Sequence, residues 1–442
     1  MSQPVTIARS KISVWWDRSL LRVLLLDPYQ RTTTFFLAIC IGVGPMALGN
    51  DNKHVYVGIA PDVPTLYTYT IVIAVIAVIY TRQAPKQDWR GLLLWTPLLA
   101  WLLVMSVLAW GFSAREMSGI LHLTLGAVVF AIGVATARRD PDGYGLPWAF
   151  AAVAWIQLLA IALSAVGLPL RRITGPQAPD LVGRAVGLTS HPGELAKVLF
   201  FCAMFALALP RKTPSQLWAA RLTLGAALTG VSLSQSRTGL VSVLVLIVGF
   251  AALEAVSSGL RRSHLMMLGT AALLGLASAP WLIARFSADP TGGARTHLIG
   301  VAARIIREHW WSGLGPNNYV AIGGFIDKLT ASGVPVHNAA LLSAAELGLF
   351  GAIALWLPFV AVSMRAFTAI KPSGGRDVAA RVIIASLPGL LLTLLTGWGL
   401  LQAPTFLILA LAFGYFGARI GHSPDADSGA AGNERGEHVD EH

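Results

Sequence analysis

Twelve apolar segments constrain the fold of this chain more than any other feature of its sequence. A transmembrane helix needs about 20 mostly apolar residues, and such segments recur along the 442 residues. They lie at 32–48, 63–80, 92–110, 118–136, 147–167, 194–209, 217–234, 238–254, 265–284, 338–364, 379–397 and 402–418. The short polar turn between 217–234 and 238–254 favours a helical hairpin over one long helix. We therefore predict an all-α polytopic membrane protein with about 12 transmembrane helices.

The composition excludes several classes of protein. Hydrophobic residues make up 55% of the chain and charged residues 12%, about half the roughly 25% charged residues of soluble domains. Cys40 and Cys202 lie in apolar segments and are too few for a zinc site or a disulfide framework. The outer loops contain no DxD motif and no cluster with metal-ligand spacing, and the chain has no GxxxxGK[ST] phosphate loop. We therefore expect no metal, no cofactor and no nucleotide, which disfavours a metal-dependent transferase and an ATP-driven pump.

The distribution of Lys and Arg indicates the orientation in the membrane. With the N-terminus in the cytoplasm, 21 of the 33 Lys and Arg residues lie in inner segments, 11 in outer loops and one, Lys197, within a span. An even number of spans places both termini in the cytoplasm. We predict an N-terminal segment at 1–31 with an amphipathic surface helix. A transmembrane domain follows at 32–422, and a disordered cytoplasmic tail at 423–442.

Most of the outer positive charges gather in three connections, at 168–193, 234–237 and 285–337. They are Arg171, Arg172, Arg184, Arg237, Arg285, Arg295, Arg304, Arg307 and Lys328. A long loop can be translocated whatever its charge, which explains 285–337 as well as function does. For the two shorter connections an anion-binding site is the better explanation, because arginine suits bidentate contact with phosphate. Nucleic acid is not expected on that side of the membrane.

The long outer loop 285–337 contains a helical pattern. Apolar residues recur at helical spacing at Leu298, Val301, Ala302, Ile305, Ile306 and Trp310. We predict a large periplasmic loop with helices lying at the membrane surface, and with Trp310 and Trp311 at the interface. The run from Gly313 to Tyr319 (GLGPNNY) predicts a tight turn.

Three polar groups near the outer ends of spans admit both structural and functional interpretations. Arg237 either extends to the lipid headgroups or binds an anion with the hydroxyl groups around it. Glu194 and Lys197 stand three residues apart and are expected to form a structural pair on one helix face. Arg184, which lies just before a predicted helix start at His191-Pro192, suits an anion.

His337, at the end of the long loop, is either an interfacial hydrogen-bonding group or a base. Histidine accepts a proton near neutral pH, and a base beside several arginines suits transfer from a phosphorylated lipid. Asn338 follows it directly. Glu346 lies nine residues further on, roughly 13 Å along a helix, so we expect it to make a buried contact in the bundle and not to orient His337.

Four motifs, in this order, resemble the O-antigen ligase and O-antigen polymerase superfamily of bacterial inner-membrane proteins. They are RAVGLTSHPGELA at 184–196, SQSRTGL at 234–240, GLGPNNY at 313–319 and HNAALLSAAELGLFG at 337–351. The number of spans and the single large outer loop before the last few spans fit the same superfamily. One departure is Gly193, where the family often has asparagine.

The resemblance implies a metal-independent, inverting glycosyltransferase, specifically an O-antigen ligase of lipopolysaccharide biosynthesis. The donor would be a glycan on undecaprenyl pyrophosphate, and the acceptor a sugar hydroxyl of lipid A–core at the periplasmic face of the inner membrane. His337 would act as the base, and Arg184 and Arg237 would bind the pyrophosphate. Further contacts to the substrates are expected from Arg295, Arg171, Arg172 and Asn338.

Other functions remain open. An O-antigen or exopolysaccharide polymerase, which extends the lipid-linked glycan, shares these motifs and much of this mechanism. A protein O-oligosaccharyltransferase usually carries an additional outer region near its C-terminus, whereas a short polar tail follows the last span here. A polysaccharide transporter or flippase would leave His337 without a role, and a scaffold would not need clustered outer arginines.

Overall fold

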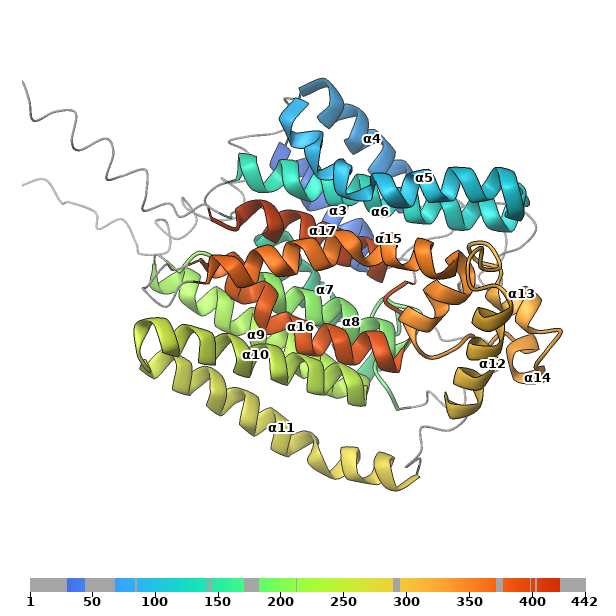
Figure 1. Cartoon of the computed structure of the whole chain (residues 1–442). Coiled ribbons are helices and arrows are strands. Elements are labelled where there is room, and N and C mark those ends of the chain that lie inside the picture. The colour runs from blue at the N-terminus through green and yellow to red at the C-terminus, as the bar shows by residue number, and fades with distance from the viewer. Residues whose placement is uncertain are drawn as a thin grey trace, which may run out of the picture.

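The computed structural model describes residues 30–43, 68–83, 86–140, 143, 145–170, 183–211, 213–288, 295–370, 377–397, 399–401 and 404–421. Within these ranges the chain is helical and contains no strand (Figure 1). The predicted amphipathic helix in the N-terminal segment and the polar tail at 423–442 lie outside the described residues. The long helices run side by side as one bundle.

Each of the twelve predicted spans corresponds to a helical segment. These are α3 (Gln30–Val43), α4 (Thr68–Gln83), a segment made of η1 (Lys86–Trp95), α5 (Thr96–Met105) and η2 (Ser106–Trp110), α6 (Ala114–Arg139), α7 (Leu146–Ala165), α8 (Pro192–Leu207), α9 (Pro214–Ser234), α10 (Arg237–Ser258), α11 (Arg262–Ala288), α15 (Ala339–Ala369), α16 (Val378–Thr396) and α17 (Thr405–Arg419). Seven described helices are long and apolar enough to cross a membrane, and two shorter ones are also apolar. The prediction of an all-α polytopic membrane protein is confirmed.

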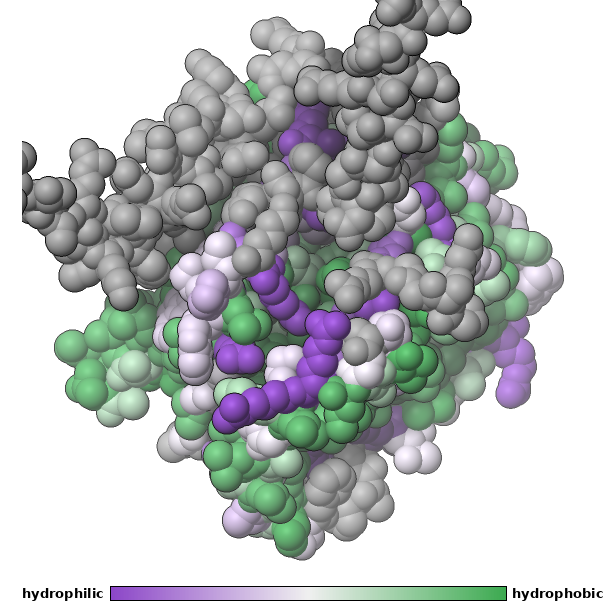
Figure 2. Space-filling view, turned by 90° about the vertical axis from the view of Figure 1, so that its left-hand side faces the viewer, coloured by the Kyte–Doolittle hydropathy of each residue, from purple (hydrophilic) through white to green (hydrophobic). Residues whose placement is uncertain are grey.

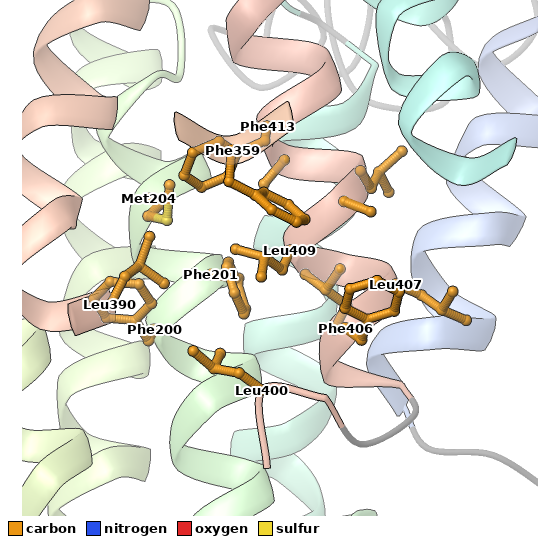
Figure 3. Packing of buried hydrophobic residues seen from close by; sticks show 14 of the residues in the cluster. Phe200, Phe201, Met204, Phe359, Leu390, Leu400, Phe406, Leu407, Leu409 and Phe413 are labelled. Carbon is orange, nitrogen blue, oxygen red and sulfur yellow. The ribbon is translucent and has the colours of Figure 1, made fainter. Parts of the chain in front are cut away.

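The core of the bundle is aromatic and is centred on α8. Phe205 of α8 stacks on Phe150 of α7 at 4.3 Å and on Phe416 of α17 at 5.0 Å between ring centroids. Figure 3 shows further side chains from α8, α15, α16 and α17 pointing toward one another. Nearly all of α8 is buried, since other helices surround it. A helix surrounded in this way is held in place by packing on several sides.

Small residues allow α6 and α17 to approach closely. A side chain at Gly133 of α6 would meet the backbone nitrogen of Tyr415 of α17 at 2.9 Å, and one at Gly414 would overlap the backbone of Phe130. Glycine at both positions therefore lets the two backbones touch, as in other membrane helix pairs.

The end of the bundle that carries the turn between α10 and α11 is rich in charged groups. Arg381 of α16 donates to Glu254 of α10 at 2.6 Å, and His264 of α11 lies 3.7 Å from the same carboxylate. Arg419 of α17 donates to the carbonyl of Asp140 at 2.7 Å. Figure 2 shows hydrophilic side chains gathered on this face and bordered by hydrophobic ones. The structure thus places at one end Arg381 and Arg419, which the sequence assigned to the inner side. Which end faces the cytoplasm stays a prediction.

The opposite end carries the residues of the long loop, which we call the cap (residues 295–338). It contains α12 (Arg295–Glu308), α13 (Tyr319–Gly323) and α14 (Lys328–Ala331), at the right of Figure 1. The helical stripe predicted here is present, but its environment differs from the prediction. Leu298, Ala302 and Ile305 are at most 1% exposed, because α12 packs on the protein and not on lipid. Trp310 and Trp311 remain about half exposed, at 50% and 47%.

The cap is joined to α15 at an interruption of that helix. At Gly348 the backbone takes φ 70° and ψ 172°, so the α-helical ladder is broken. Three backbone hydrogen bonds to the cap replace it: Leu314 N to Ala345 O at 2.9 Å, Gly315 N to Glu346 O at 2.8 Å, and Leu349 N to Trp310 O at 2.8 Å. A carbonyl or amide at membrane depth is costly unless it is paired, and the cap supplies these partners.

Candidate functional site

Three helices begin close together at the cap end of the bundle. Helix α8 begins after His191, α10 after Ser236 and α15 after Asn338. A Cβ at Gly239 of α10 would lie 2.5 Å from the Cβ of Ala196 of α8, so the first turns of these two helices touch. His191 and His337 are near enough to interact electrostatically. Because His337 lies just before α15, this helix also begins near the other two. Helix N-termini carry partial positive charge and unpaired backbone amides, so this convergence favours an anion.

The first turn of α8 is built around His191 and Pro192. The Nδ1 atom of His191 accepts a hydrogen bond from the amide of Gly193 at 3.0 Å and so caps the helix. The carboxylate of Glu194 accepts hydrogen bonds from the amide and the hydroxyl of Ser190. Glu194 and Lys197 interact electrostatically, but each is also bound to the turn itself: the Nζ atom of Lys197 donates to the carbonyl of Gly193 at 3.1 Å.

The hairpin between α9 and α10 positions two of the predicted arginines. Gln235 adopts a left-handed conformation (φ 53°) that ends α9, and Ser236 caps α10 by accepting from the amide of Gly239 at 3.2 Å. Arg237 is therefore the first residue of α10. Arg184, from the connection before α8, donates through Nε to the carbonyl of Ser234 at 3.2 Å. The polar turn that the sequence singled out thus places Arg237 at the start of α10 and binds the guanidinium of Arg184 through Ser234.

His337 is partly buried where the cap returns to the bundle. Its Nδ1 atom is buried and has no hydrogen-bond partner among the residues that the structure describes. Burial lowers the pKa of His337, and the positive charges of Arg295 and Lys197 lower it further, against an opposing hydrogen bond to the carbonyl of Pro335. Burial also lowers the pKa of His191, to about 4, with contributions from Lys197, Arg184 and His337. Both imidazoles are therefore neutral at pH 7, the form in which histidine can accept a proton.

The structure places some of the predicted site residues close together. His337, Arg184 and Arg295 belong to one electrostatic neighbourhood, through their effects on the two histidines. Arg237 is the first residue of α10, whose first turn contacts α8 at Gly239 and Ala196. Asn338 caps α15, and its side-chain oxygen accepts from the amide of Leu341 at 3.0 Å. Arg171 and Arg172 lie outside the described residues.

Sequence reasoning missed two members of this neighbourhood, His191 and Lys197. The first was interpreted only as a helix start and the second as a structural partner of Glu194. A signal existed: Lys197 lies within the predicted span 194–209, and a cation there is costly unless it has a role. Among the described residues, no group of three His, Cys, Asp or Glu side chains is arranged as a metal site.

Comparison with known proteins bears on this geometry. The family model described as O-antigen ligase matches residues 222–356. This segment of the chain is similar to the O-antigen ligase family. The matched O-antigen ligase region contains Arg237, Arg295 and His337, whereas Arg184 and the first turn of α8 precede it. No curated protein matches the chain. The O-antigen ligase family supports a glycosyltransferase-like enzyme, of the ligase or polymerase kind, in a multi-pass membrane protein.

Proposed function

We propose that this protein is an O-antigen ligase that transfers a glycan from undecaprenyl pyrophosphate to a sugar hydroxyl of lipid A–core. The observation that carries the proposal is a neutral, partly buried His337 beside three helix N-termini and several arginines, within and next to a region of the O-antigen ligase family. The site would face the periplasm from the inner membrane, with 32–422 as the transmembrane domain and both termini in the cytoplasm.

His337 would act as the base on the acceptor. The sugar hydroxyl attacks the anomeric carbon of the donor, its proton passes to the imidazole, and the bond from that carbon to the pyrophosphate oxygen breaks. Direct attack inverts the anomeric centre. A positioned base contributes about 10²–10⁴ in rate, and the low pKa of His337 keeps it ready to accept the proton at neutral pH.

The arginines would stabilise the leaving group. Negative charge grows on the pyrophosphate as the bond breaks, and fixed positive groups near a low-dielectric boundary stabilise that charge without reorganising. Arg237 stands at the start of α10 and Arg184 is tied to the same hairpin through Ser234. Arg295 begins α12 and interacts electrostatically with His337. Arg171, Arg172 and the amide of Asn338 would add contacts to the sugars or headgroups.

The first test measures transfer by purified protein supplied with a polyprenyl-pyrophosphate glycan and lipid A–core, separated on a gel. His337→Ala should lose about 10²–10⁴ of the rate, and Arg237→Ala about 10²–10³. Arg304→Ala is the matched control, because Arg304 is 62% exposed on the cap and pairs with Glu308. If correctly inserted His337→Ala and Arg237→Ala proteins kept full activity, the proposed mechanism would be wrong.

The same assay separates a ligase from a polymerase, whose lipid-linked acceptor would use the same base and arginines. Glycan that appears on the core only when core is supplied identifies a ligase. Longer glycan on the carrier, with the core unmodified, identifies a polymerase and overturns the assignment of the acceptor.

A further inference from the structure

Lys197 is a cation that the proposed mechanism does not use. It lies one turn into α8, between Ala196 and Val198, which are both fully buried. Side chains on a helix lean toward its N-terminus, and the Lys197 ammonium accordingly reaches back to the carbonyl of Gly193 at 3.1 Å. The charge therefore sits at the level of the first turn of α8, beside the site and not deep in the bundle.

The connection between α16 and α17 closes over this ammonium. A Cβ at Gly399 would overlap the Lys197 nitrogen and would lie 2.9 Å from its Cε atom. The same end of α16 is fastened to α10, because the hydroxyls of Thr396 and Thr238 are 3.2 Å apart. Glycine at 399 thus leaves the space that the Lys197 side chain fills, and three elements meet around one charge.

Lys197 also holds the turn that presents His191. The amide of Gly193 donates to His191 at 3.0 Å, while the carbonyl of the same residue accepts from Lys197. Both polar groups of Gly193 are therefore used, and the neutral His191 ring is left with its proton on Nε2. The charge of Lys197 acts on both His191 and His337, and Glu194 is the acidic group that acts on Lys197 itself.

We propose that Lys197 is a positioning residue, which joins the first turn of α8 to the connection between α16 and α17 and places a positive charge beside His191 and His337. This inference rests on the proposed function, since it assigns Lys197 to the same site. It acts through the two histidines and the Gly193 turn, so we do not class it as catalytic.

The test compares Lys197→Met with Lys197→Arg, which keeps the charge. The groups that face His337 are Arg295 of α12, Lys197 of α8 and the imidazole of His191, and those that face His191 include Arg184. Removing one positive charge raises the pKa of both histidines. In Lys197→Met the acidic limb of kcat/KM should therefore move upward by on the order of 0.5 pH unit, about 3-fold in the protonation ratio. Lys197→Arg should leave the limb in place.

A second readout does not depend on transfer. Diethyl pyrocarbonate modifies neutral imidazoles. The rate of modification at His191 and His337, followed by mass spectrometry at several pH values, therefore gives the midpoint of each histidine's titration directly. The midpoints should rise in Lys197→Met and stay unchanged in Lys328→Met, a control on the cap. If they shift while the wild-type protein transfers no glycan, the proposed function fails and the placement of the charge stands. If transfer occurs but neither limb nor midpoint moves, the inference about Lys197 is wrong.

Gly399→Ala leaves Lys197 unsubstituted and so covers the case in which Lys197→Met is poorly folded, and a double-mutant cycle joins the two variants when both fold. Gly399→Ala displaces the ammonium while keeping its charge, and should lower kcat/KM by itself. If Gly399 acts through Lys197, adding Gly399→Ala to Lys197→Met should cost less than Gly399→Ala does alone, since coupled residues are not additive. Independent, additive losses would overturn the proposed link between the two elements.

Discussion

Replacing Gly348 with alanine tests the junction between the cap and α15. Gly348 has φ 70° and ψ 172°, a conformation that is accessible essentially only to glycine. A Cβ at this position would overlap the carbonyl oxygen of Trp311 and lie 2.6 Å from its carbonyl carbon. Both atoms belong to the backbone, so a change of side-chain rotamer cannot relieve the overlap. We therefore expect Gly348→Ala to separate the cap from the helix.

The magnitude follows from these two effects. Holding alanine in this backbone conformation costs about 1–3 kcal/mol, and forcing an extra methyl group into a packed site costs about 1–3 kcal/mol. The expected loss of stability is therefore about 2–6 kcal/mol. If the cap shifts to avoid the overlap, the bonds of Leu314, Gly315 and Leu349 to their partners are lost instead, at a cost of roughly 1 kcal/mol each.

Thermal unfolding in detergent measures the effect, and Gly300→Ala is the matched control. Gly300 lies on the helical cap segment α12, and a Cβ added there would have no other atom within 4 Å, so alanine should be neutral or stabilise by up to about 1 kcal/mol. The two substitutions add the same methyl group to the same part of the protein, and their effects on the free energy of unfolding should have opposite signs. If Gly348→Ala and Gly300→Ala unfolded at the same temperature as the wild type, the proposed junction would be refuted.

Three further predictions concern charged groups. Because the pKa of His337 is lowered, kcat/KM should stay constant as the pH falls through 6.5 and should decline only below that pH. Initial rates measured between pH 5 and 8 test this, and a decline that begins at or above pH 6.5 would contradict it. Arg381→Met should destabilise the bundle by about 3–5 kcal/mol, because it removes the buried cation that neutralises the carboxylate of Glu254. Adding Glu254→Gln should restore part of the lost melting temperature, and a double variant without any recovery would argue against this ion pair. Hydrogen bonds from His297 and a backbone amide lower the pKa of Asp327 from 3.8 to about 2. The stabilisation of α14 by this carboxylate should therefore be present at pH 4 and lost toward pH 2. Amide hydrogen exchange in α14 measures the effect, and protection that persists in Asp327→Asn would contradict the prediction.

The helices were predictable because hydropathy alone determines where a chain can cross a membrane. All twelve predicted spans contain a helix, and the turn at Ser234–Arg237 separates two helices as expected. The environment of α12 was not predictable. Its stripe at Leu298, Ala302 and Ile305 fits a membrane surface as well as a protein surface, because periodicity reveals which face is apolar and not what covers it.

The sequence could indicate the arginines and His337 as candidates, since cations in outer loops oppose the positive-inside trend, and their roles stay predictions. The roles of His191 and Lys197 were not predictable. Their importance comes from contacts with Gly193 and Gly399 and from their closeness to His337. Gly399 follows Lys197 by about 200 residues, and no pattern within one segment reports a contact of that range.

The interruption of α15 has a consequence for the order in which the protein is assembled. Residues 310–315 of the cap precede α15 in the chain and emerge from the ribosome first, yet their hydrogen-bond partners are in the helix that follows. The part of α15 around Gly348 likewise lacks full pairing until these residues reach it. The pairing of the cap with α15 can therefore be completed only after both segments have been synthesised, and each then supplies backbone partners that the other lacks.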